Sequence, residues 1–158
     1  MSAHAPSTVL TDVLDEQKVY FELIPHHRTQ SAAAEAEATG VDPGHVAKTI
    51  ILLTEAGFVR AVLSASKRID LRKVKAALGS GEVHLASERV LASQYPEFEL
   101  GAVPPLGGAR NDRVLMDEHL RHVESVVLEA GTHEQSLRIR TADLAAIAGA
   151  RIADICED

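Results

Sequence analysis

The sequence predicts a single domain of the α/β class (α+β mixed), with a mixed, mostly antiparallel sheet surrounded by helices. The chain has 158 residues and is 46% hydrophobic, which is enough for one core, and no repeat or linker-like stretch divides it. Two apolar runs, 48–53 and 58–63, flank the short segment Glu55-Ala56-Gly57 and indicate an antiparallel hairpin. Capped helical segments alternate with further short apolar runs, so helices are expected around the sheet.

The helices are recognised from apolar periodicity and from the residues at their ends. Ser31, Asp70, Ser87 and Thr141 each precede or open a helical pattern and can accept hydrogen bonds from its first amides. Glycines follow three of these segments, as is typical of helix C-termini. The expected helices cover residues 9–19, 32–39, 70–78, 87–95 and 141–148.

The remaining strands are short apolar runs bounded by turn-forming residues. Residues 137–140 alternate apolar and charged side chains, which is typical of a half-buried strand. Asp42-Pro43-Gly44 is expected to form a turn, and residues 100–108 a loop. The strands are placed at 20–24, 83–85, 113–116, 125–129 and 137–140, and the domain core at about 20–149 of 1–158, with frayed tails.

Composition and charge exclude several classes of protein. The net charge of −7 disfavours indiscriminate nucleic-acid binding, so DNA is not an expected partner. One cysteine, Cys156, cannot form an intramolecular disulfide, and no apolar run reaches the roughly 20 residues that span a bilayer. The N-terminus lacks the pattern of a secretory signal. The expectation is therefore a cytoplasmic protein that does not bind membranes.

One basic segment interrupts this acidic chain. Residues 59–75 contain six basic residues against only Asp70. A solvated helix face is the simpler interpretation, and a local contact with phosphates is the alternative. The basic residues are Arg60, Lys67, Arg68, Arg72, Lys73 and Lys75.

Lys48 is the most informative single residue. It opens the apolar run Ala47-Lys48-Thr49-Ile50-Ile51-Leu52-Leu53, which resembles a buried strand. Burying a charge is costly unless the charge is paired or used, so Lys48 is either a solvated strand end or a cation directed into a pocket. The rest of the chain favours the pocket.

Two loops could contribute further groups to such a pocket. Gly101-Ala102-Val103-Pro104-Pro105-Leu106-Gly107-Gly108 is stiffened by its prolines, and the amides of its first three residues could bind a carbonyl or an oxyanion. Taken alone, this loop is more simply a connector. Gly131-Thr132-His133 follows an apolar strand, and His133 could contact a substrate or transfer a proton. A surface histidine in a turn is an equally good interpretation.

Metal and cofactor sites lack support in the sequence. His119 and His122 could share a metal with Asp117 on a helix, but no third well-spaced ligand is visible, so no metal is expected. No P-loop, Rossmann glycine pattern or nucleophile elbow is present, and no cofactor is expected. His26 and His27 are adjacent, so at most one of them can face a site.

Three segments together resemble the YbaK family, which comprises free-standing aminoacyl-tRNA deacylases and the editing insertion domain of bacterial prolyl-tRNA synthetases. The segments are "VAKTIIL", "GAVPPLG" and "EAGTHEQSLRIRTADL", and the resemblance runs from about Tyr20 to Ile147. It implies a mixed sheet with surrounding helices and hydrolysis of the ester between a wrongly attached amino acid and the tRNA 3′ end. Ala130 departs from members with a hydroxyl side chain there, which weakens a cysteine-specific assignment.

The resemblance also assigns residues. The family lysine falls on Lys48, its polar neighbour on Thr49, and a functional histidine of some members on His133, two residues after Gly131. The family's Gly-x-x-Pro-Pro loop falls on residues 101–105, and thus on Gly101, Ala102, Val103, Pro104 and Pro105.

The expected mechanism uses charge and position and forms no covalent enzyme intermediate. Lys48 would bind the 3′-terminal phosphate or ribose region and stabilise negative charge, while the loop amides hold the carbonyl or ribose. Water or a substrate group would attack. The basic residues Arg60, Lys67, Arg68 and Arg72 would contact the acceptor stem of a mischarged tRNA.

Alternatives to this function stay open at the level of sequence. A non-catalytic module of the same fold could recognise tRNA, a synthetase or a small ligand, and hydrolysis of another small ester is a third option. An aminoacyl-tRNA synthetase is a second candidate partner. Alanine, cysteine, serine and proline are all candidate amino acids, because a hydrophobic pocket distinguishes one methylene by only about 1–3 kcal/mol.

Overall fold

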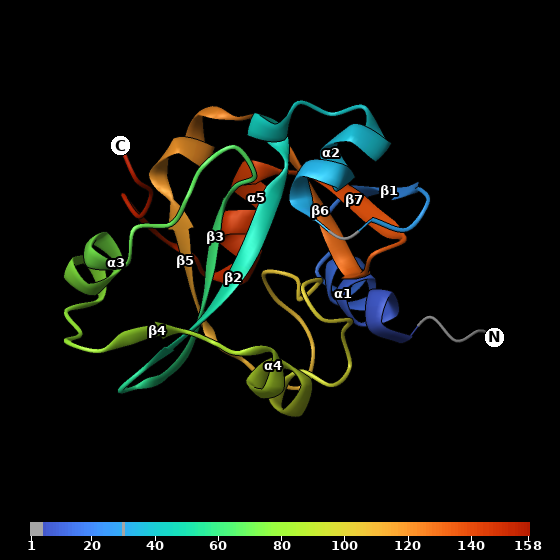
Figure 1. Cartoon of the computed structure of the whole chain (residues 1–158). Coiled ribbons are helices and arrows are strands. Elements are labelled where there is room, and N and C mark those ends of the chain that lie inside the picture. The colour runs from blue at the N-terminus through green and yellow to red at the C-terminus, as the bar shows by residue number, and fades with distance from the viewer. Residues whose placement is uncertain (1–4, 30) are drawn as a thin grey trace.

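The structure, a computed structural model, describes residues 5–29 and 31–158, and its strands form two sheets (Figure 1). The smaller sheet is antiparallel and has the order β1-β7-β6, with strands Phe21–Pro25, Gln135–Arg140 and Ser125–Thr132. The larger has the order β4-β2-β3-β5-β8, with strands Val83–Leu85, Ala47–Thr54, Gly57–Ser64, Arg113–Asp117 and Arg151–Ala153. The β3–β5 and β5–β8 pairs are parallel. The expected mixed α/β class is confirmed, with two sheets in place of one.

The hairpin of β2 and β3 is the longest paired unit and follows the sequence pattern. Its register runs from Ala47 opposite Ser64 to Thr54 opposite Gly57. Gly57 has φ +119°, a conformation that side chains disfavour. The Thr54 hydroxyl donates to Gly57 O at 2.8 Å and accepts from Ala56 N at 3.2 Å, which closes the turn. The predicted antiparallel hairpin is thus confirmed.

Five α-helices and two 3₁₀ helices surround the sheets in the part of the chain that the structure describes. The side chains of Ser31, Asp70 and Ser87 accept from the first amides of α2, α3 and α4, as predicted. Thr141 is instead the first residue of α5, which has no side-chain cap. The elements are α1 Ala5–Glu16, α2 Ala32–Thr39, η1 Pro43–His45, α3 Leu71–Leu78, α4 Glu88–Gln94, η2 Glu118–His122 and α5 Thr141–Ala148.

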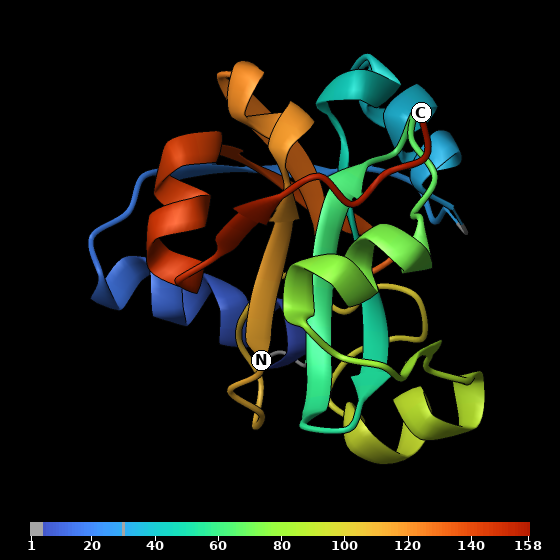
Figure 2. The same ribbon diagram turned by 90° about the vertical axis from the view of Figure 1, so that its left-hand side faces the viewer.

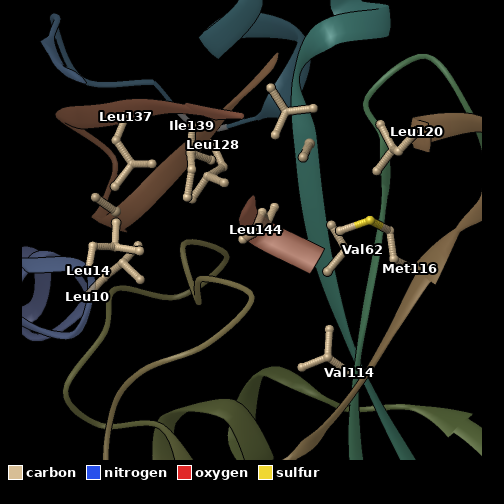
Figure 3. Close-up of a cluster of buried hydrophobic side chains, with 13 residues drawn as sticks. Leu10, Leu14, Val62, Val114, Met116, Leu120, Leu128, Leu137, Ile139 and Leu144 are labelled. Atoms are coloured by element: carbon tan, nitrogen blue, oxygen red, sulfur yellow. The ribbon is translucent and has the colours of Figure 1, made fainter. Parts of the chain in front are cut away.

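The main core lies between the two sheets and includes buried leucines of α1 and α5 (Figure 3). Strand β3 is central in its sheet, and its side chains alternate between the two faces of that sheet. A hydrophobic cluster covers each face, so both are buried. Val62 points into the main core, while Val59, Ala61 and Leu63 pack with Val74 of α3 in a second cluster. Figure 2 shows α3 lying over this second face. Side chains of β3 from Val59 to Ser64 therefore enter a packed interior, whatever their polarity.

Both ends of the chain contribute to the core, which corrects the expected limits of about 20–149. Leu10 and Leu14 of α1 are buried in the main cluster. At the other end, β8 pairs with β5, and Cys156 forms an isolated bridge with Ile69. Burial raises the pKa of the Cys156 thiol to about 12, so the thiol stays protonated and is a poor nucleophile. The C-terminal segment is therefore structural.

The two sheets meet at one point that places the site. Val46 and Val127 form an isolated parallel bridge, and both side chains are buried. From this bridge β2 continues in the larger sheet and β6 in the smaller one, so the residues that follow line a space between the sheets.

Candidate functional site

A pocket of about 190 Å³ opens next to the Val46–Val127 bridge, between the two sheets. Four parts of the chain supply its walls: the first turns of α2, the start of β2, the loop before β5 and the middle of β6. The described residues that line it are Ser31, Ala32, Glu35, Ala47, Lys48, Thr49, Ile50, Gly101, Val103, Leu128 and Glu129. Three segments far apart in sequence, each named in the sequence analysis, thus come together.

Lys48 lies in this pocket as a half-buried cation. Its ammonium group forms no hydrogen bond or ion pair with any residue that the structure describes, and Thr49 lines the wall beside it. Burial lowers the pKa of Lys48, and the nearby Arg68 guanidinium adds to this effect. Lys48 therefore borders a pocket, and the direction of its charge into that pocket stays a prediction.

Of the three residues at the start of the Gly101–Gly108 loop, two line the pocket. Gly101 has φ +83° and lines the pocket with Val103, and neither amide donates to a protein acceptor among the described residues. The Ala102 amide donates to Glu99 O at 3.0 Å, so it is not available to a substrate. Ala102, Pro104 and Pro105 are buried and do not line the pocket, which corrects their expected role as substrate contacts.

Arg60 holds this loop from beneath and is not a surface residue. Only 1% of its side chain is exposed. Its Nε donates to Asp112 Oδ2 at 3.1 Å, its Nη1 to Pro104 O at 2.9 Å and its Nη2 to Gly107 O at 2.9 Å. Tyr95 donates its hydroxyl to the same Asp112 oxygen at 2.6 Å. The expected contact of Arg60 with tRNA is wrong, because β3 is the central strand and buries both of its faces.

His133 is buried behind the pocket. Its backbone amide donates to Glu99 Oε1 at 3.0 Å, its Nε2 lies 2.6 Å from Leu100 O, and its Nδ1 lies 2.9 Å from Glu129 Oε2. These contacts tie the start of the glycine loop to β6. Gly131 is buried in the irregular end of β6. Neither His133 nor Gly131 lines the pocket, and their direct contact with substrate stays a prediction.

Two glutamates that the sequence analysis did not select form part of the pocket wall. Glu35 of α2 is 1% exposed, and burial raises its pKa to about 7. Burial also raises the pKa of Glu129 in β6 to about 8, with the nearby Glu99 carboxylate adding to the effect. The available signal was weak: Glu35 is one of two acidic residues in an alanine-rich helix, and Glu129 is the one acidic residue of an apolar strand. Nothing in the neighbouring sequence indicates that either glutamate is buried.

A second histidine supports Glu35 from below. Ser136 of β7 is hydrogen-bonded to Glu35 Oε2, and His26 Nε2 lies 2.9 Å from the Ser136 hydroxyl. His27 is exposed. Of the two adjacent histidines, His26 therefore faces the polar residues beneath the pocket, although it does not line the pocket itself.

The other basic residues of segment 59–75 lie at the surface or near it. Arg68 and Arg72 are exposed, and Lys67 is half-buried. Arg72 pairs with Asp70 at 3.6 Å, and its side chain is 91% exposed. These three residues stay candidates for a contact with phosphates, and the Arg68 guanidinium helps to lower the pKa of Lys48.

A third candidate metal ligand does exist, contrary to the sequence analysis. Ligand atoms of Asp117, His119 and Asp154 lie within 4.8 Å of one another. Asp117 is already engaged, because its carboxylate accepts from Ile155 N at 3.2 Å, His119 N at 3.2 Å and His119 Nδ1 at 2.8 Å. This carboxylate orders η2 and the C-terminal segment.

Among the described helices, none is long and apolar enough to cross a membrane.

Comparison with known proteins gives a consistent family. The sequence model described as "Aminoacyl-tRNA editing domain" matches residues 26–147. The uncharacterized protein YwhH of Bacillus subtilis (strain 168) is 25% identical over 139 residues, or 85% of this chain and 87% of YwhH. EbsC of Enterococcus faecalis (strain ATCC 700802 / V583), a proposed Cys-tRNA(Pro)/Cys-tRNA(Cys) deacylase, is 21% identical over 126 residues, or 79% of this chain and 76% of EbsC.

The fold is also found in solved structures. A crystal structure described as a proposed trans-editing enzyme for prolyl-tRNA synthetase superposes with a TM-score of 0.85 at 24% identity. The match covers 99% of this chain and 100% of that one. At this level of identity the likeness establishes the fold.

Proposed function

Because this chain belongs to the family of aminoacyl-tRNA editing domains, we propose that it hydrolyses the ester bond of mischarged aminoacyl-tRNA in trans. We further propose that the substrate is a small amino acid attached to tRNA(Pro). The name of EbsC supports this choice of tRNA. The pocket volume of about 190 Å³ supports a small aminoacyl group.

One observation carries the proposal: Lys48, whose ammonium group has no partner among the described residues, lines the same small pocket as Gly101 and Val103, whose amides donate to no described acceptor. Hydrolysis of an ester places negative charge on the carbonyl oxygen when water attacks the carbon. Donors that are already fixed around that oxygen stabilise the charge without reorganising. Lys48 supplies a full charge and the loop supplies neutral donors, so together they suit an oxyanion.

The remaining steps need little from the protein. After attack, the bond between the carbonyl carbon and the ribose oxygen breaks, and the ribose oxygen leaves as a hydroxyl after taking a proton. An aminoacyl ester is already activated, so positioning and charge stabilisation are sufficient. No described side chain in the pocket is a cysteine or histidine. We propose that the attacking group is water or a group on the substrate.

Contact with the acceptor stem is assigned to the exposed part of the basic segment. Arg68 lies close to Lys48, and Lys67 and Arg72 are its neighbours along the chain. The chain as a whole carries a charge of −7, so this contact would be weak and sensitive to salt. An aminoacyl-tRNA synthetase stays a candidate second partner.

The test is deacylation of Ala-, Ser- and Cys-tRNA(Pro) by the wild-type protein and by Lys48→Ala. We expect hydrolysis of at least one substrate and a loss of roughly 100-fold or more in kcat/KM for the variant, the range seen when one oxyanion donor is removed. Lys75→Ala, at an exposed position of α3, is the matched control and keeps full activity.

Two outcomes would overturn the proposal. Folded wild-type protein that hydrolyses none of the three esters is not a deacylase of this class, and a non-catalytic module of the same fold then becomes the better assignment. Full activity in a folded Lys48→Ala variant would remove Lys48 from the mechanism.

A further inference from the structure

Two carboxyl groups lie at the end of the pocket formed by α2 and β6. Glu35 comes from α2 and Glu129 from β6, and the pocket is lined by both. Glu129 stands directly opposite Ser136 in the β6–β7 register, and Ser136 is hydrogen-bonded to Glu35. The two carboxyl groups therefore lie on either side of Ser136, and the negative charge of Glu129 adds to the rise in the pKa of Glu35.

Each carboxyl group has one oxygen held by the protein and one that is not. Glu35 Oε2 is bonded to Ser136, and Glu129 Oε2 to His133. Neither Oε1 accepts a hydrogen bond from any residue that the structure describes. Since Glu35 is 1% exposed and lines the pocket, its second oxygen has only the pocket from which to receive a donor.

Hydrogen bonds to backbone carbonyls fix the protons of the two supporting histidines. His133 Nε2 lies 2.6 Å from Leu100 O, and His26 Nδ1 lies 2.6 Å from His27 O. A carbonyl oxygen only accepts, so each of these nitrogens carries hydrogen. The other ring nitrogen faces a glutamate, directly in His133 and through Ser136 in His26. Glu129 with His133, and Glu35 with Ser136 and His26, therefore form two hydrogen-bonded units.

These two units can switch between a neutral and a charged carboxyl group. Burial raises the pKa of Glu35 to about 7 and that of Glu129 to about 8, so near neutral pH both charged and neutral forms of these carboxyl groups are populated. A cation next to a carboxyl group favours its ionised form. Such a cation would donate hydrogen bonds to the Oε1 atoms, and the glutamate proton would be released.

The pocket is therefore polarised. Neither Glu35 nor Glu129 forms an ion pair with Lys48 or with any other described lysine or arginine. The lysine and the loop amides suit an anion or an oxyanion, while the glutamate pair suits a cation. An aminoacyl ester carries both kinds of group within a few bonds: an α-ammonium beside the carbonyl, and a nucleotide phosphate beyond the ribose.

We propose that Glu35 and Glu129 bind the α-ammonium group of the aminoacyl ester and so select substrates with a free amino group. This inference rests on the proposed function and adds the residues that orient the substrate. With the ammonium at the glutamates, the ester carbonyl lies toward Lys48, Gly101 and Val103. Esters of the same size without the positive charge are rejected, because the desolvated carboxyl groups then lack their donor.

The test compares L-alanyl-tRNA with L-lactyl-tRNA, which has a hydroxyl group in place of the ammonium. Rates are divided by the uncatalysed hydrolysis of each ester, because the two esters differ in intrinsic reactivity. We expect the wild-type protein to prefer the alanyl ester by about tenfold or more, the range for a hydrogen bond to a charged group. In Glu35→Gln/Glu129→Gln, the preference falls to within about twofold, because the rate for the alanyl ester drops and that for the lactyl ester does not.

Binding measurements separate this inference from the proposed function. The probes are 3′-deoxy-3′-(L-alanylamino)adenosine and its lactoylamino counterpart, which the protein cannot hydrolyse as esters. We expect tighter binding of the alanyl compound by the wild-type protein and equal binding by the double variant. The matched control is Glu37→Gln, at an exposed position of α2, which keeps the wild-type preference.

The outcomes are distinct. If no ester is hydrolysed but the alanyl probe is preferred through the glutamates, the proposed function fails and the ammonium site stands. If alanyl-tRNA is hydrolysed but the folded double variant keeps the full preference in rate and binding, the ammonium site is wrong and the deacylase stands.

Discussion

Two buried charged clusters differ in how their charges are satisfied. In the cluster beneath the glycine loop, Arg60 donates to Asp112 and to three backbone carbonyls, and Tyr95 donates to the same carboxylate. In the cluster at the pocket, Glu35 and Glu129 have no cationic side chain as an ion-pair partner other than the titratable His133, among the residues described. Paired charge is fixed and supports structure, whereas two acids without a permanent counter-charge change protonation near neutral pH.

The protonation of the two clusters shows the same difference. Burial, with the help of the Asp112 hydrogen bond, raises the pKa of Tyr95 to about 12, so this cluster keeps one charge state over the whole physiological range. The pKa values of about 7 and about 8 at Glu35 and Glu129 fall inside that range. Perturbed carboxyl groups in a cleft are typical of functional sites.

The largest expected effect comes from breaking the paired cluster. Arg60→Met leaves the Asp112 carboxylate buried without its cation, which costs about 3–5 kcal/mol of unfolding free energy. Chemical denaturation measures this loss. The control Arg68→Met, at an exposed position, changes stability by less than about 0.5 kcal/mol.

A second variant tests whether the missing partner is the cause. Asp112→Asn keeps an acceptor for Tyr95 and removes the charge, so Arg60→Met/Asp112→Asn is expected to be more stable than the sum of the single effects predicts. Additive losses, or a loss below about 1 kcal/mol for Arg60→Met, would contradict a structural role for this ion pair.

The next effect concerns His133, which connects the two clusters through the glycine loop. His133→Ala removes its ring contacts with Leu100 O and Glu129, at a cost of about 1–3 kcal/mol for the groups left without partners. Deacylation also falls, because Gly101 loses the support of the ring. Urea denaturation and kcat/KM measure the two effects. His84→Ala, at an exposed position of β4, is the control; equal stability of the two variants would contradict the prediction.

The unpaired cluster makes stability depend on pH. In the unfolded chain both glutamates ionise near their ordinary pKa of 4.5, whereas in the folded protein they keep protons up to about 7 and about 8. The folded state therefore binds more protons between these limits, and the unfolding free energy falls as pH rises. Each group contributes about 1.4 kcal/mol per pH unit within its own window.

Neutral variants measure that contribution. Glu35→Gln is expected to reduce the fall of unfolding free energy with pH between pH 5 and about pH 7. Glu129→Gln is expected to reduce it up to about pH 8. Urea denaturation midpoints measured across this pH range show both effects. Glu37→Gln, exposed on the same helix as Glu35, leaves the slope unchanged. Slopes identical to wild type in both buried variants would show that these carboxyl groups titrate normally.

Exposed charges are expected to have the smallest effect. Arg68→Glu/Arg72→Glu raises the KM for mischarged tRNA roughly three- to tenfold at low salt, and the difference shrinks as salt rises, because phosphate contacts of exposed side chains are screened. Steady-state kinetics at two salt concentrations measures this. Arg151→Glu, exposed on β8, is the control, and an unchanged KM at low salt would remove this surface from the contact with tRNA.

Local features of the chain were readable from the sequence because neighbouring residues decide them. The caps at Ser31, Asp70 and Ser87 and the β2–β3 hairpin depend on hydrogen bonds and on side-chain alternation within a few residues. The sequence also identified Lys48 as a charge at the end of an apolar strand, since such a charge needs a reason to be there.

Tertiary structure decided what lies around each of these residues. Arg60 differs from Arg68 only through its place on a central strand with two buried faces, which its neighbours in sequence do not reveal. Glu35 and Glu129 are brought together by the β6–β7 register and by the packing of α2. Burial and proximity are properties of the whole fold. The sequence therefore determined which charged groups the protein has, and the fold determined which of them form ion pairs and which line the pocket.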